Sequence, residues 1–299
     1  MTPRPPALRP GAGWAYALIA FAACLWATWR FVVLAAERLA KPPGLDARVE
    51  AVVVMIVITL VGFALLPFSR RHEARTVLDW AAVAWLGIAD AMNILLLFAA
   101  YAKTTVAIAV TTHYLTPIFV AASAPLLLKE RSHGAWVAAV GGALGLAVLL
   151  RPWSSDIGRS DLIGAAAGAG SAFFYASNVL VNKRLVAKFS PVELMAYHGV
   201  VATPFLALLA PAHGFAALTT ASTLVLTLGG ILPGALGGIM FITGLKRVRA
   251  SHASTLTLIE PVVAVGIAVI WFGERLPWTS WLGASIVLAC ATAITVKRE

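Results

Sequence analysis

The sequence predicts an all-α integral membrane protein whose ten transmembrane helices form two inverted five-helix repeats. Three observations lead to this fold class. Hydrophobic residues make up 60% of the 299 residues, whereas charged residues make up only 12%. The apolar residues gather in runs that are long enough to cross a bilayer. The chain also aligns with itself at a shift of 144 residues.

The composition excludes a soluble globular domain, which carries about 25% charged and about 45–50% apolar residues. The mean hydropathy of +0.87 indicates that lipid takes the place of water around most of the surface. The net charge of +10 comes from short basic clusters between apolar runs. This pattern indicates membrane topology and contact with anionic lipid rather than nucleic-acid binding. Cys24 and Cys290 lie inside apolar runs without metal-ligand spacing, so we expect neither a metal site nor a disulfide, and no cofactor.

Each membrane span needs about 20 predominantly apolar residues. The proline-rich segment 1–13 is expected to be a disordered cytoplasmic tail. A cleaved signal peptide is the alternative for the first apolar run, but the length of that run favours a retained helix. The expected spans are Trp14–Ala36, Arg48–Pro67, Trp80–Tyr101, Thr105–Leu128, Gly134–Leu150, Leu162–Val181, Pro191–Ala210, Ala221–Gly244, Ala253–Phe272 and Thr279–Val296.

The distribution of basic residues predicts the orientation of these spans. The two ends and alternate connections carry 15 Lys and Arg residues, whereas the remaining connections carry 7. Cytoplasmic connections are enriched in Lys and Arg. We therefore expect both termini to be cytoplasmic in a multi-pass protein of a bacterial-type inner membrane.

The internal repeat aligns His113–Arg131 with Thr257–Arg275 without a gap. Pro117 falls on Pro261, and both segments end in Glu-Arg. The alignment equates the fourth span with the ninth. Because five is an odd number of spans, the two repeats insert in opposite orientations, an arrangement that is recurrent in secondary transporters with a site between the repeats. The predicted repeats are residues 14–152 and 160–298.

The second repeat resembles a known family. The run FITGLKRVRASHASTLTLIEPVVAVGIAVIWFGERL has the Lys-Arg-Val, Ala-Ser, Glu-Pro and Gly-Glu-Arg elements of an EamA-type repeat, from the drug/metabolite transporter superfamily. The run FAAYAKTTVAIAVTTHYLTPIF is a divergent version in the first half. The resemblance implies a ten-helix carrier that exports small metabolites or amino acids. One departure is the run Ala-Thr-Trp-Arg-Phe after Leu25-Trp26, where the family has small polar residues.

Asp90 is a carboxylate near the middle of the third span. An aspartate at a helix centre costs about 2.5–3.5 kcal/mol on the insertion scale. Asp90 is therefore expected to be shielded, paired or protonated. Asn93, three residues further on, lies on the same helix face. Two interpretations stay open: a role in transport, or an interhelical hydrogen bond.

The fourth and ninth spans each combine a titratable residue with a proline. Glu260 precedes Pro261, and a proline inside a membrane helix frees a backbone carbonyl and can create a kink. His113 precedes Pro117 by one turn, and a histidine can titrate near neutral pH. We interpret the two prolines as hinges, and Glu260 and His113 as candidates for substrate binding or proton coupling. The alternatives are a structural Glu-Pro pair and a neutral imidazole bonded to a neighbouring helix.

The sixth span carries a polar stripe. Ser171, Tyr175, Asn178 and Asn182 follow one another at helical spacing. Such a stripe lines a cavity or packs against a second polar helix. We favour cavity lining, with Tyr175 and Asn178 in contact with substrate.

In the first span, Trp26 and Arg30 lie one turn apart, where a cation–π contact would bring both to the substrate. The alternative for Arg30 is a side chain that extends to the membrane surface. His198 in the seventh span is a weaker candidate of the same kind as His113.

These residues predict a secondary transporter that works by alternating access. Its substrate would be a small amphipathic metabolite such as an amino acid, and its other contacts membrane lipid, as a monomer or homodimer. A passive facilitator or channel on the same fold is the alternative. A membrane-embedded enzyme is disfavoured because the sequence has no zinc-protease, nucleophile-elbow or nucleotide-binding motif.

Overall fold

A computed structural model describes residues 13–69, 74–154, 157–273 and 275–296, and in these residues the regular structure is helical. Residues 1–12, which belong to the predicted tail, lie outside the described part of the chain, and Gly13 is already the first residue of a helix. The first half contains α1 Gly13–Trp26, α2 Trp29–Leu39, α3 Ala47–Leu65, α4 Val77–Lys103, α5 Val106–His113, α6 Thr116–Leu127 and α7 His133–Leu150. The second half contains α8 Arg159–Leu185, α9 Pro191–Leu209, α10 Thr220–Gly229, the π-helix η4 Gly230–Leu236, α11 Gly237–Leu245, α12 Ala250–Leu256, α13 Ile259–Phe272 and α14 Trp278–Val296.

Nine helices in the described residues are long and apolar enough to cross a membrane. Each one corresponds to an expected span. The expected sixth span lies within α8, a helix of 27 residues that is not one of the nine. The polar stripe of α8 faces other helices rather than lipid, which explains why its average composition is less apolar.

Local sequence signals explain where several helices begin. Thr76 caps α4 in a capping box with Asp79, and Ser190 caps α9 in a capping box with Glu193. In each box the hydroxyl and the carboxylate satisfy backbone N–H groups of the first turn, which have no partner inside the helix. Pro191 follows Ser190 at the first helical position, where its missing N–H costs nothing.

The fourth and ninth spans are each interrupted. α5 ends at His113 and α6 begins at Thr116, whereas α12 ends at Leu256 and α13 begins at Ile259. Pro117 and Pro261 stand in the first turns of α6 and α13, so both helices break just before a proline, which cannot donate a backbone hydrogen bond. The expectation of a kink at these two prolines therefore agrees with the backbone.

Two further interruptions were not expected. α1 and α2 are separated at Ala27–Thr28, where the Thr28 hydroxyl donates a hydrogen bond of 2.6 Å to the Leu25 carbonyl. The eighth span passes through the π-helix η4, which contains Pro233. A hydroxyl that binds the preceding turn and a π-bulge are both recognised causes of helix bending.

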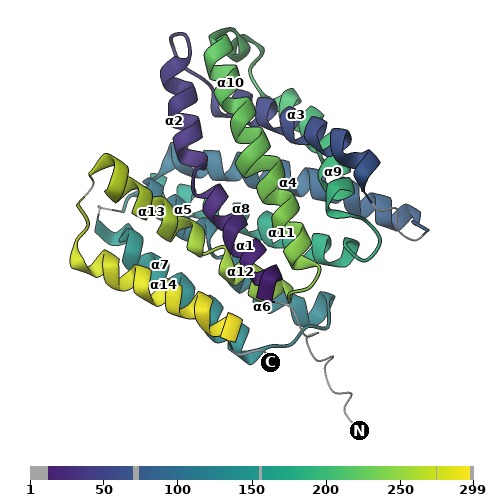
Figure 1. The fold of residues 1–299 in the computed structure, drawn as a ribbon. Coiled ribbons are helices and arrows are strands. Elements are labelled where there is room, and N and C mark those ends of the chain that lie inside the picture. Colours follow the sequence, from purple (N-terminus) through teal and green to yellow (C-terminus); the bar gives the residue numbers. More distant parts are fainter. Residues whose placement is uncertain (1–12, 70–73, 155–156, 274, 297–299) are drawn as a thin grey trace.

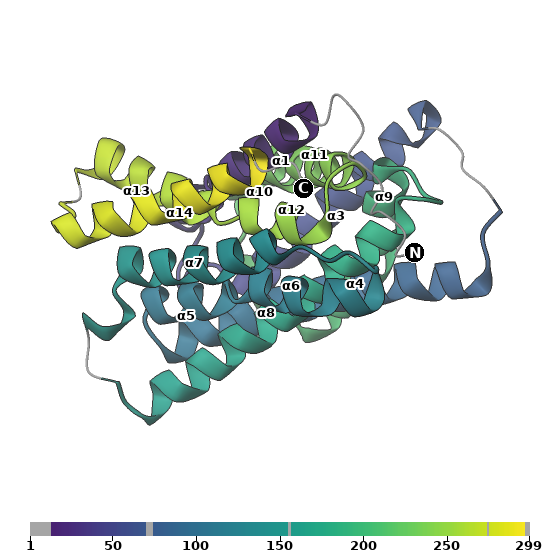
Figure 2. The same cartoon turned by 90° about the horizontal axis from the view of Figure 1, so that it is seen from below.

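The helices form a bundle whose two halves are interleaved (Figure 1). α4 packs along α8, and α3 packs along α9. α7 and α14 pack against each other at the opposite edge of the bundle from α3 and α9 (Figures 1 and 2). The start of α1 and the end of α14 lie near each other in both views. The central space is therefore bordered by helices of both halves.

The contact between α7 and α14 depends on Gly283. A Cβ atom at this position would lie 2.3 Å from the Leu149 backbone nitrogen and 2.6 Å from the Gly145 carbonyl oxygen. Backbone atoms cannot move away as a side-chain end can, so we expect Gly283→Ala to destabilise the protein by about 1–3 kcal/mol through overpacking. Thermal unfolding in detergent would measure this. Gly266→Ala is the matched control, since a Cβ there meets nothing within 4 Å, and an equal loss in both variants would contradict the prediction.

Candidate functional site

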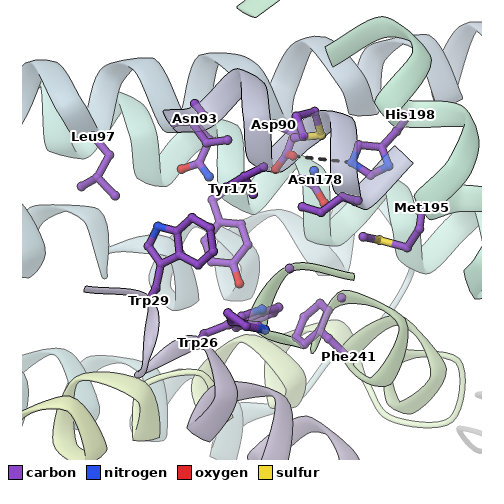
Figure 3. A pocket seen from close by; sticks show the side chains of 18 of the residues that line it. Trp26, Trp29, Asp90, Asn93, Leu97, Tyr175, Asn178, Met195, His198 and Phe241 are labelled. Carbon is purple, nitrogen blue, oxygen red and sulfur yellow. Dashed lines mark ion pairs between the residues drawn. The ribbon is translucent and has the colours of Figure 1, made fainter. Parts of the chain in front are cut away.

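A cavity of about 310 Å³ lies at the centre of the bundle. Side chains from both halves line it (Figure 3). The first half contributes Trp26, Trp29, Val33, Glu50, Ala51, Val54, Met55, Ile58, Asp90, Asn93, Ile94, Leu97, Phe98, Tyr101 and His113. The second half contributes Tyr175, Asn178, Asn182, Met195, His198, Pro233, Gly234, Gly238, Phe241, Ile242 and Glu260. The volume is at the lower end of the range for small-molecule sites.

Asp90 of α4 pairs with His198 of α9 across the cavity. The Asp90 Oδ2 and His198 Nε2 atoms are 3.5 Å apart (Figure 3). The other ring nitrogen, His198 Nδ1, lies 2.7 Å from the Leu194 carbonyl oxygen. Because a carbonyl only accepts, Nδ1 carries a proton in this arrangement. In a neutral ring Nε2 has no proton, and its lone pair would then face the lone pairs of the carboxylate, which is unfavourable. The contact becomes favourable when one additional proton lies on Nε2 or on the carboxylate.

A chain of hydrogen bonds connects three helices beside this pair. His113 Nδ1 lies 2.9 Å from the Ser171 hydroxyl, which donates a hydrogen bond of 2.7 Å to the Asn93 amide oxygen. The His113 ring is stacked on Tyr175, with the ring centroids 5.6 Å apart and the planes 8° from parallel. His113 thus both lines the cavity and bonds a neighbouring helix, which combines the two interpretations that the sequence left open.

Aromatic side chains form the opposite wall of the cavity. Trp26, at the end of α1, lies 5.3 Å from Phe241 of α11 between ring centroids. Trp29 begins α2 and extends into the same space (Figure 3). The interruption between α1 and α2 brings both indole rings to the cavity, and large aromatic rings are suited to bind a flat or apolar part of a ligand.

Glu260 lies at the start of α13, where the ninth span resumes after its interruption. It lines the cavity, and Tyr114 lies within interaction distance of its carboxylate. Tyr114 follows α5, so this contact joins the two interrupted spans. The carboxylate and the helix break therefore occur together, as the Glu-Pro sequence predicted.

Eight residues were predicted to bind substrate or to couple transport to protons. Seven of them line the cavity: Trp26, Asp90, Asn93, His113, Tyr175, Asn178 and Glu260. Arg30 does not. Its side chain is exposed, although it is close enough to Tyr101 to interact electrostatically. The helix restarts at Trp29, so Trp29 rather than Arg30 points inward. Pro117 and Pro261 are buried and lie outside the lining.

The sequence interpretation missed two lining residues of chemical interest. Trp29 belongs to the run that departs from the family pattern, and its inward direction depends on the helix break. Glu50 stands next to Arg48 at the edge of the expected second span, where a charged residue ordinarily faces the membrane surface. Its inward direction was not predicted, because the apolar pattern of the span does not show which way a residue in the first turn of α3 points.

Three ion pairs join helix ends at the side expected to be cytoplasmic. Arg75 and Glu193 approach to 2.6 Å, and Lys188 and Asp79 to 2.7 Å. Lys183 and Glu130 are 3.7 Å apart. These pairs link connections that are distant in the sequence, and they lie away from the cavity lining.

Glu130 also binds the second half directly. Its Oε2 atom accepts the backbone N–H of Ala250 at 2.7 Å, at the start of α12. Lys183 donates to the carbonyl oxygens of Leu245 and Val248, at 2.8 and 2.6 Å. The Glu-Arg end of the fourth span thus caps the beginning of the ninth, while its counterpart Glu274 lies outside the described residues.

In the part of the chain that the structure describes, no group of three or more His, Cys, Asp or Glu residues could hold a metal ion.

The many apolar helices define the class of protein: a multi-pass membrane protein, with a cavity between its helices. The EamA-like transporter family matches the chain twice, over residues 13–151 and 162–296. The chain therefore belongs to the EamA-like transporter family and is a membrane transporter.

Named relatives have low identity. An uncharacterized transporter of Archaeoglobus fulgidus is 28% identical over 76% of this chain and 79% of its own length. A riboflavin transporter of Rhizobium johnstonii is 27% identical over 80% of both chains. A probable terminal-alkyne amino-acid exporter of Streptantibioticus cattleyicolor is 28% identical over 58% of this chain and 59% of its own. A crystal structure with 17% identity, a TM-score of 0.78 and coverage of 95% of this chain and 98% of its own shares the fold.

Proposed function

We propose that this chain is a secondary transporter that exports small metabolites, such as amino acids or related amphipathic compounds, by alternating access. It would act in a bacterial-type inner membrane with both termini cytoplasmic. Its ten membrane helices would form two inverted repeats, residues 14–152 and 160–298. The observation that carries the proposal is the central cavity, because both halves of the chain line it with polar and aromatic side chains.

The inverted repeat is supported by matched interruptions. The fourth span breaks at Tyr114–Leu115 and the ninth at Thr257–Leu258. The two breaks lie 143 positions apart, one position from the shift of 144 that aligns the sequence with itself. The helix pairs are matched as well. α4 packs on α8, and the corresponding α10 and α11 of the second half pack on α2 and α1. A site between two such repeats is the arrangement through which rocking of one repeat against the other gives alternating access.

The choice of substrate class follows from the lining. Aromatic rings offer area for an apolar body, and single carboxylates and amides offer hydrogen bonds for a polar end. No cluster of Lys or Arg lines the cavity among the described residues, which disfavours phosphorylated compounds. Relatives named as a riboflavin transporter and as a probable terminal-alkyne amino-acid exporter support a small organic solute.

A passive facilitator or channel on the same fold is the competing function. Ion pairs between helix ends favour a carrier, since a carrier needs contacts that form and break as one side of the bundle closes and opens. We expect saturable counterflow in proteoliposomes when the internal solution holds an excess of the unlabelled substrate. A panel of amino acids, vitamins, nucleosides and amphipathic amines would identify the solute through stabilisation of the purified protein. Flux without saturation or counterflow would show a channel instead.

A further inference from the structure

Glu50 is a buried carboxylate that the proposed transport cycle does not yet use. It stands in the first turn of α3 and is 2% exposed. Its Oε1 atom is buried and has no hydrogen-bond partner among the described residues. A buried carboxylate without a partner is unfavourable by several kcal/mol unless it is neutralised. An ionisable residue that is buried inside a membrane protein is a candidate for a functional role.

The neighbouring cation does not neutralise Glu50. Arg48 donates hydrogen bonds of 2.9 and 2.7 Å to the two carboxylate oxygens of Asp46, and one of 3.1 Å to the Leu209 carbonyl. These bonds lower the pKa of the Asp46 carboxyl below its ordinary value. Asp46 also accepts the backbone N–H of Arg48 at the start of α3. Asp46 thus both caps the start of α3 and pairs with Arg48, so Glu50 is needed neither as a helix cap nor as the partner of Arg48.

Glu50 gives the cavity an excess of acidic groups. Of the three carboxylates in the lining, Asp90 has His198 as its partner and Glu260 has Tyr114. Glu50 has none. The lining, in the described part of the chain, contains no Lys or Arg to balance these groups. A cavity with one sign of charge in low-dielectric surroundings concentrates ligands of the opposite sign.

The aromatic wall is suited to the same ligand. Trp26, Trp29 and Phe241 line the cavity that Glu50 borders. Indole faces attract organic cations, with energies of about 0.5–2 kcal/mol according to how far the cation is desolvated. The same rings can pack against the apolar body of the ligand. A cavity of about 310 Å³ fits a molecule with one or two rings and a short side chain.

We propose that Glu50 binds the ammonium group of an amphipathic organic amine whose apolar body lies among Trp26, Trp29 and Phe241. This inference rests on the proposed transport function, since it assigns the chemical class of the substrate of that same cavity. The ammonium supplies the donors that Glu50 lacks among the described residues. Zwitterions would bind more weakly than amines, because their carboxylate faces an acidic lining.

Three indole compounds that differ in charge test the assignment. Tryptamine is a cation, tryptophan is a zwitterion and indole-3-propionate is an anion at neutral pH. Titration calorimetry on the purified full chain in detergent would measure each affinity. We expect tryptamine to bind at least about tenfold more tightly than indole-3-propionate, with tryptophan between them. Equal affinities for the amine and the anion would overturn the proposal.

Variants at position 50 connect the preference to the carboxylate. Glu50→Gln keeps the size of the side chain and is expected to weaken tryptamine binding about tenfold while leaving indole-3-propionate unchanged or tighter. Glu50→Asp keeps the charge but shortens the side chain by one methylene, so we expect a tryptamine affinity between those of wild type and Glu50→Gln. This second variant tests the assignment even if Glu50→Gln does not fold. Glu37→Gln removes the same charge from an exposed position outside the lining. Because Glu37 interacts with Glu50 only electrostatically, this variant should change the tryptamine affinity far less than Glu50→Gln does. An unchanged tryptamine affinity in folded Glu50→Gln would overturn the assignment.

The proposal and the transport function fail in different ways. Counterflow of another solute without binding of any indole compound would overturn the amine site and leave the carrier intact. Charge-selective binding that requires Glu50, in vesicles that show no counterflow for any solute, would support the site and overturn the carrier.

Discussion

An Asp90→Asn variant is expected to lose the response of transport to a pH gradient, with a rate under that gradient at least about tenfold below wild type. The reason is the pair of Asp90 and His198, in which Nδ1 of the ring donates to the Leu194 carbonyl and Nε2 faces the carboxylate at 3.5 Å. In this geometry the contact is favourable only when the pair takes up an additional proton. Asparagine cannot take up that proton, and coupling free energies between sites are typically about 1–3 kcal/mol, which corresponds to 5–150-fold.

Other groups face Asp90 and provide the controls. Asn93 follows it on α4, and Tyr175 and Asn178 face it from α8. The titratable Glu50, His113 and Glu260 also line the cavity. Of these groups, Glu50 and Glu260 are the further carboxylates that could carry a transported proton.

Proteoliposome uptake with and without an imposed pH gradient measures the coupling. His198→Gln should resemble Asp90→Asn, because it removes the other half of the pair. Asp46→Asn removes a carboxylate outside the lining and should behave as wild type. A full gradient response in Asp90→Asn, together with its loss in Glu260→Gln, would assign the proton to Glu260 instead. A full response in Asp90→Asn, Glu260→Gln and Glu50→Gln would contradict proton coupling through this cavity.

The fold could be predicted largely because lipid limits the alternatives. A chain in a bilayer must satisfy its backbone hydrogen bonds internally, so long apolar runs become helices. Nine of the expected spans correspond to helices of suitable length and composition. The breaks at Pro117 and Pro261 could be expected because proline lacks the N–H donor. The break at Ala27–Thr28 could not, since neither residue excludes a helical conformation and the cause is a side-chain hydrogen bond.

The candidate site could be predicted for a related reason. A polar residue inside an apolar run is costly unless it faces the interior, and this identified Asp90 and Glu260 without knowledge of the packing. The direction of a residue near a helix end needs the helix bounds. Trp29 rather than Arg30 lines the cavity because α2 begins at Trp29. Glu50 lies within the expected second span, but a charged residue in the first turn of a membrane helix ordinarily faces the membrane surface, and its inward direction depends on how α3 packs.

An Arg75→Met variant is expected to destabilise the protein by about 3–5 kcal/mol, the usual effect of removing one partner from a buried ion pair. The Glu193 side chain is only 5% exposed, and Arg75 approaches it to 2.6 Å. The guanidinium also lies 4.1 Å from the centroid of the Phe189 ring, so the variant loses a cation–π contact as well. Thermal unfolding in detergent should show a decrease of roughly 10 °C, at about 2–4 °C for each kcal/mol.

The double variant Arg75→Met/Glu193→Gln distinguishes a buried charge from lost packing. If the cost arises from the unpaired Glu193 carboxylate, neutralising it should restore at least half of the lost stability, because a buried pair replaced as a unit is often nearly neutral. Arg48→Met is the matched control. It breaks the Arg48–Asp46 pair, whose side chains are 44% and 30% exposed, and exposed pairs contribute about 0–1 kcal/mol. A double variant as unstable as Arg75→Met would assign the loss to the contact with Phe189, and an unchanged single variant would show that the pair does not stabilise the bundle.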